Sequence, residues 1–150
     1  MVEFLASDST RSKIFQLAQQ LKFFQGRFKI GNSAKASVAT NSLTFTDGTT
    51  ENQITYTSSS EPLIKQLTML FENISATLEL GRRLEHLRHG NPSGLAAELR
   101  RMERMSKQGR LVEFRAIAPV VQQIASDETL PEISRRYARA ILKDSGSQPN

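Results

Sequence analysis

The feature that most constrains this chain is a long amphipathic segment between residues 60 and 90. Its apolar side chains recur mostly at spacings of three and four, the periodicity of one face of an α-helix. They are Leu63, Ile64, Leu67, Leu70, Phe71, Ile74, Leu78, Leu84 and Leu87. Gly90, followed by Pro92, is typical of a helix end. At 1.5 Å per residue the helix is about 42 Å long. A compact domain of this size does not require such length, so other elements must lie along it.

The apolar stripe of this helix has two interpretations. Leu63, Leu67, Leu70, Ile74 and Leu84 follow a heptad-like seam, which would form the interface of an oligomer. Ile64, Phe71 and Leu78 widen the stripe, as on a helix that packs against the core of its own chain. Gly81 interrupts the helix at a cost of about 1 kcal/mol relative to alanine. It predicts the close approach of another backbone.

The N-terminal part predicts one helix and a small sheet. Residues 8–26 carry Ile14, Leu17 and Leu21 on one side and suit an amphipathic helix. Residues 27–57 alternate apolar with polar or threonine side chains, as half-buried strands do. Asp47 and Gly48 form a turn signal between residues 42–46 and 53–57. We expect a Thr-rich antiparallel hairpin or a three-stranded sheet.

The C-terminal part predicts a bundle of three short helices over residues 94–143. The segments are 95–107, 111–126 and 132–143, and the second is apolar nearly all round, so it should be the most buried. Pro119 predicts a kink or the start of another helix. Residues 144–150 are expected to be a disordered tail. The predicted fold is a predominantly helical α+β protein, with residues 1–143 forming a single domain.

Two stretches resemble known families. Residues 116–125 and 131–142 resemble the last two helices of an armadillo or HEAT repeat, which implies that they pack as a helical hairpin. No second copy of the repeat occurs in the chain. Residues 9–24 and 76–90 are similar to segments of the peroxisomal membrane-proliferation peroxins, although the Thr-rich strands depart from that pattern. Neither resemblance implies a site residue here.

The excess positive charge lies in the C-terminal half. Residues 1–80 hold seven basic and seven acidic side chains, whereas residues 81–150 hold thirteen and eight. The candidate site for nucleic acid or another acidic partner comprises Arg82, Arg83, Arg88, Arg100, Arg101, Arg104, Lys107 and Arg110. Arginine predominates, which suits bidentate contacts to phosphate or carboxylate. The interleaved glutamates allow the alternative that this is a solvated, internally paired surface.

Catalytic and metal-binding patterns are missing from the sequence. There is no cysteine, no glycine-rich phosphate loop and no Gly-x-Ser-x-Gly elbow. His86 and His89 are three residues apart, but a zinc site needs at least three protein ligands. We expect no catalytic residues, no metal and no cofactor.

The expected function is therefore that of a non-enzymatic interaction or assembly module, self-associating or part of a larger complex. The alternative is a protein that binds RNA or single-stranded DNA through residues 82–110. Binding to a membrane surface through residues 8–30 is a weaker third alternative. No run approaches about 18 apolar residues, and the N-terminus lacks a signal-peptide pattern. We expect a soluble intracellular protein of the cytoplasm or nucleus.

Overall fold

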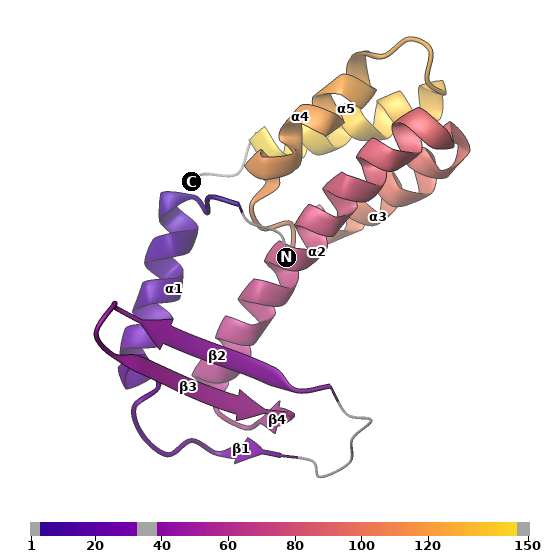
Figure 1. Cartoon of the computed structure of the whole chain (residues 1–150). Coiled ribbons are helices and arrows are strands. Elements are labelled where there is room, and N and C mark those ends of the chain that lie inside the picture. Colours follow the sequence, from indigo (N-terminus) through magenta and orange to yellow (C-terminus); the bar gives the residue numbers. More distant parts are fainter. Residues whose placement is uncertain (1–3, 33–38, 147–150) are drawn as a thin grey trace. The chain divides into compact units, whose positions relative to one another are not determined.

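Pro62–Gly90 form one continuous helix, α2, which confirms the long helix that the apolar periodicity predicts (Figure 1). The structure is a computed structural model that describes residues 4–32 and 39–146. The chain divides into two compact units, residues 8–70 and residues 1–7 with 71–150. We name their described parts the mixed unit and the helical unit. The predominantly helical α+β class is as predicted.

The mixed unit contains α1 (Asp8–Gln20), a short 3-10 helix (Lys22–Phe24), four strands and the first turns of α2. Strands β2 (Asn41–Thr46) and β3 (Glu51–Tyr56) form the predicted antiparallel hairpin. The other two strands, β1 (Ile30–Gly31) and β4 (Ser58–Ser59), form a separate antiparallel pair. The strands of the described residues thus make two two-stranded sheets, rather than one of three strands.

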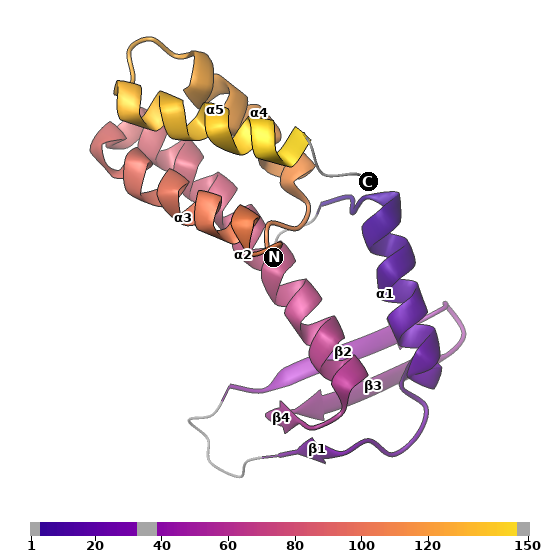
Figure 2. The ribbon, with the colours of Figure 1, turned by 180° about the vertical axis from the view of Figure 1, so that it is seen from behind.

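Side-chain alternation explains how the hairpin is covered. Leu43, Ile54 and Tyr56 are buried, while the intervening threonines are exposed. Figures 1 and 2 show α1 and the first turns of α2 on the same face of the hairpin. The hydroxyl of Tyr56 is hydrogen-bonded to that of Thr68 on α2. The apolar faces of both helices therefore provide the core that a two-stranded sheet lacks by itself.

The first helix is shorter than the predicted range 8–26, because α1 ends at Gln20. Lys22, Phe23 and Phe24 have positive φ angles of 49°, 51° and 64°. This left-handed turn directs the chain toward the hairpin, where the ring centroid of Phe23 lies 4.5 Å from that of Phe45. Phe24 is also buried. Aromatic packing therefore ends the helix where local periodicity would have continued it.

The helical unit combines the last turns of α2 with α3 (Leu95–Lys107), α4 (Phe114–Ser126) and α5 (Glu132–Gly146). A short 3-10 helix, Pro92–Gly94, joins α2 to α3. Helix α5 packs against both α3 and α4 (Figure 2). The buried residues of the core are Leu80, Leu84, Leu95, Leu99, Met102, Met105, Ile117, Val121, Ile124, Leu130, Ala138 and Ile141.

Gly81 marks the close approach that its position in the helix predicts. A Cβ atom at this residue would lie 2.3 Å from Cγ2 and 2.9 Å from Cβ of Ile117 on α4. The Cα atom of Ile117 would be only 3.9 Å away. Glycine is therefore required because a side chain would occupy the space that Ile117 already fills.

Three predictions for the C-terminal helices need correction. Helix α4 starts at Phe114 instead of Leu111 and continues through Pro119, which excludes the start of another helix, one of the two alternatives for that residue. It has three buried residues against five on α3, so it is not the most buried helix. Helix α5 extends to Gly146, beyond the predicted tail boundary at Asp144. Residues 147–150 of that tail lie outside the described residues.

The helix orientations depend on packing as well as on composition. On α5 the buried line includes Ser134, Ala138 and Ile141, whereas the apolar Ile133 is exposed. None of the helices in the described ranges combines the length and the apolar character that crossing a membrane requires.

Candidate functional site

Most basic side chains of the predicted site have partners within the helical unit. Four of them pair with glutamate: Arg82 with Glu79 (3.1 Å), Arg83 with Glu98 (3.0 Å), Arg88 with Glu85 (3.1 Å) and Lys107 with Glu103 (2.8 Å). Arg110 donates a hydrogen bond to Oδ1 of Asn73 (3.2 Å). The interpretation of a paired surface thus holds for these five residues. Exposed pairs of this kind add little to stability, about 0–1 kcal/mol each.

Arg100 and Arg104 differ from the other predicted site residues. Both are exposed, and within the described ranges neither has a hydrogen-bond or ion-pair partner. Arg101 forms a long ion pair with Glu98, with 4.0 Å between its guanidinium nitrogen and the carboxylate oxygen. Positions 100 and 104 are one helical turn apart and therefore share a face of α3.

The two glutamates of α3 do not lie on this face. The core side of the helix is defined by Leu95, Leu99, Met102, Met105 and Ser106, which are all buried. At 100° per residue, Arg104 lies opposite the centre of that side, with Arg100 and Arg101 beside it. Glu98 and Glu103 lie on the two flanks, where they are partly buried and paired with Arg83 and Lys107. On the outer face of α3, Arg100 and Arg104 therefore carry positive charge that no carboxylate of their own helix pairs with, whereas Arg101 reaches Glu98 at 4.0 Å.

A third unpaired arginine is on the neighbouring helix. Arg136 of α5 is exposed, and no partner for it occurs among the described residues. Helices α3 and α5 pack side by side. The two helices run in the same direction (Figure 2), which places Arg100 and Arg136 in their corresponding first halves.

We name Arg100, Arg101, Arg104 and Arg136 the arginine face. The sequence analysis placed three of these residues in the candidate site and missed Arg136. The helical periodicity of residues 132–143 could have placed Arg136 on the outer side of its helix. Periodicity within one helix does not reveal, however, which other helix packs beside it.

The pKa of Lys107 is raised above its ordinary value, mainly because its ammonium group donates a hydrogen bond to Glu103 and interacts with that carboxylate's charge. Its positive charge is consequently secure at neutral pH. Lys107 lies next to the arginine face. We do not include it in the face, because its ammonium group is already paired with Glu103.

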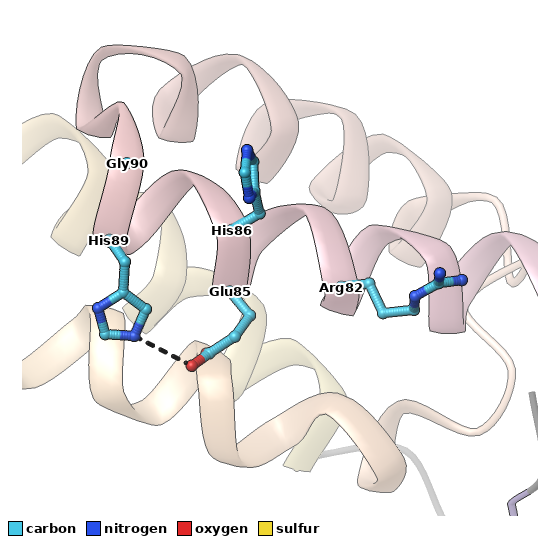
Figure 3. Close-up of a pocket in the computed structure, with 5 residues that line it drawn as sticks. All are labelled: Arg82, Glu85, His86, His89 and Gly90. Atoms are coloured by element: carbon cyan, nitrogen blue, oxygen red, sulfur yellow. Dashed lines mark hydrogen bonds and ion pairs between the residues drawn. The ribbon is translucent and has the colours of Figure 1, made fainter.

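His86 and His89 lie in an exposed recess at the end of α2. Arg82, Glu85, His86, His89 and Gly90 line an open recess of about 580 Å³ at the end of α2 (Figure 3). Nε2 of His89 is 3.2 Å from Oε1 of Glu85, whereas His86 points away from both residues (Figure 3). Across the described ranges, no three His, Cys, Asp or Glu side chains are grouped so that they could hold a metal ion.

The predicted oligomer interface lies largely inside the chain. Leu67, Leu70, Ile74 and Leu84 are buried, and Leu63 is partly buried. Self-association through this set stays a prediction, but these side chains contribute to the chain's own core. The large apolar side chains that α2 leaves exposed are Met69 and Phe71.

Comparisons with protein-family models, with curated proteins and with solved structures find no match for this chain.

Proposed function

We propose that this chain is a non-enzymatic interaction module that docks an acidic partner on the arginine face. The observation that carries the proposal is that Arg100, Arg104 and Arg136 are exposed and unpaired in the helical unit. Unpaired charges on one surface raise the local concentration of an oppositely charged partner and accelerate its association.

The titratable groups support a role in binding rather than catalysis. Catalytic residues usually have pKa values displaced by burial or by a charged neighbour within a cleft. Among the described residues, the clear pKa shifts occur at Asp47 and Lys107, which are exposed, and at Asp127, which is half-buried. Local hydrogen bonds from Thr49 and Thr50 lower the pKa of Asp47, and those from Thr129 lower that of Asp127. The two aspartates hold turns together, and Lys107 is paired with Glu103 along α3.

The test compares two triple variants with the same loss of charge. One replaces Arg100, Arg104 and Arg136 with alanine. The control replaces Arg11, Arg82 and Arg139, which are exposed but paired with Asp8, Glu79 and Glu132. The probes are heparin and poly-glutamate, and the measurements are the salt concentration that elutes each protein and the dissociation constant.

We expect the wild type and the control to bind these polyanions and the arginine-face variant to lose binding, because Arg100, Arg104 and Arg136 are the exposed, unpaired arginines among the described residues of the helical unit. Equal binding by both variants would contradict the proposal, as would a wild type that binds no polyanion.

Self-association is a second candidate, and the exposure of Met69 and Phe71 on α2 favours it. Light scattering coupled to size-exclusion chromatography measures the molar mass directly. A strictly monomeric chain at tens of micromolar would remove this candidate and leave the arginine face unaffected.

A further inference from the structure

We propose that the partner on the arginine face is the sugar–phosphate backbone of a nucleic acid. This inference rests on the proposed function, and it specifies the chemistry of the partner. Arginine has a planar group that donates two parallel hydrogen bonds to one phosphate, which distinguishes it from the point charge of lysine. The exposed cations without a partner on the described parts of α3 and α5 are Arg100, Arg104 and Arg136, and none of them is lysine.

The composition of the face argues against a protein partner. Stable protein interfaces contain a desolvated core, usually anchored by aromatic or aliphatic side chains within a polar rim. Among the described residues, no large apolar side chain of α3 is exposed, and on α5 only Ile133 is, at 39%. Between the arginines, the outer surface of α3 has Ala97, and Gln108 follows at the C-terminal cap of the helix. The arginine face thus has the polar character of an interface rim but lacks the apolar core of a stable protein interface. Contacts to phosphates do not require such a core.

The spacing of the charges suits a repeating phosphate chain. Arg100 and Arg104 are four residues apart, or about 6 Å along the helix axis. Arg136 lies on α5, the helix that packs beside α3, so the unpaired cations are not confined to one helix. The acids nearest in sequence are paired with other basic side chains: Glu98 with Arg83, Glu103 with Lys107, and Glu132 of α5 with Arg139. A phosphate at this face therefore approaches cations without directly meeting an unpaired carboxylate of α3.

The face also predicts the mode of binding. The arginine face contains no aromatic side chain on which a base could stack. We therefore expect contacts to the sugar–phosphate backbone of the nucleic acid and none to its bases. Binding is then independent of base sequence, and its strength depends on salt because each contact releases a counterion. Three contacts, from the unpaired arginines, give a slope of log K against log salt of about −2.7. Affinity for a duplex consequently falls about 40-fold between about 50 and 200 mM salt.

Fluorescence anisotropy with labelled oligonucleotides tests this inference. The probes are single- and double-stranded DNA and RNA of two unrelated sequences, each titrated at about 50, 100 and 200 mM salt. We expect micromolar or tighter binding at the lowest salt, the same affinity for both sequences, and the slope given above. The triple alanine variant of Arg100, Arg104 and Arg136 should bring the slope close to zero, because each lost phosphate contact reduces it by about one. The control variant of Arg11, Arg82 and Arg139 should retain both affinity and slope. Circular dichroism checks that both variants fold.

The outcomes separate this inference from the proposed function. Binding to poly-glutamate or heparin without binding to any oligonucleotide overturns the nucleic-acid assignment and leaves the acidic-partner function intact. Absence of binding to every polyanion overturns both. Oligonucleotide binding that the arginine-face variant retains shows that phosphates bind elsewhere and also overturns the assignment. Binding that the variant loses supports it, and the DNA and RNA arms then distinguish the source of the backbone.

Discussion

Replacing Gly81 with alanine tests the closest helix approach in the helical unit. The new Cβ atom would lie 2.3 Å from Cγ2 of Ile117, well inside the roughly 3.5–4.0 Å at which carbon atoms attract one another. It would also lie 2.9 Å from the Cβ atom of Ile117, which no rotation of that side chain can move away. Helix α2 or α4 must therefore shift, and overpacking of this kind costs about 1–3 kcal/mol.

An opposing effect sets the net magnitude. Alanine in a helix interior is favoured over glycine by about 1 kcal/mol, so relief of the glycine penalty offsets part of the strain. Because two contacts of the new Cβ atom lie below 3 Å, we take the upper part of the strain range, about 2–3 kcal/mol, and expect Gly81→Ala to lower the free energy of unfolding by about 1–2 kcal/mol. Gly90→Ala is the matched control at the end of the same helix, because a Cβ atom there has nothing within 4 Å. It should leave stability unchanged or raise it by up to about 1 kcal/mol.

Urea unfolding monitored by circular dichroism measures both variants. The double variant Gly81→Ala with Ile117→Ala removes the Cγ2 atom that lies closest, so its destabilisation should be less than the sum of the single effects. A Gly81→Ala protein as stable as the wild type, or strict additivity in the double variant, would refute the explanation by close packing.

Two further predictions concern stability. Leu84→Ala should lower the free energy of unfolding by about 2–5 kcal/mol without changing the molar mass, because the fully buried side chain belongs to the chain's own core. A loss below about 1 kcal/mol, or dissociation of an oligomer, would contradict this expectation. At the β2–β3 turn, the amides of Thr49 and Thr50 donate to Asp47 and lower its pKa below 3.8. Because the folded pKa is the lower one, the carboxylate stabilises the turn above the unfolded pKa, and this contribution disappears as pH falls through the folded value. The two amide resonances should therefore titrate with a midpoint below 3.8, and Asp47→Asn should abolish the titration; a midpoint at or above 3.8 would contradict the assigned hydrogen bonds.

The arginine face shows how far a candidate site can be predicted from one sequence. Counting charges located the basic segment and selected Arg100, Arg101 and Arg104. It could not separate these residues from Arg82, Arg83 and Arg88, since pairing of Arg83 with Glu98 depends on how α2 meets α3. The sequence analysis did not include Arg136 in the candidate site for the same reason. The proximity of its helix to α3 arises from the packing of two segments that are distant in sequence.

The sequence by itself determined the helical class, the extent of α2, and the β2–β3 hairpin with its turn at Asp47. These features follow from periodicities and backbone preferences that act within a few residues. Only the tertiary structure decided where α1 ends, which face of α5 is buried and which cations stay unpaired. Those properties depend on contacts between distant segments, as when Phe23 meets Phe45 and Glu98 meets Arg83. Local periodicity contains no information about such contacts, and the arginine face is a product of them.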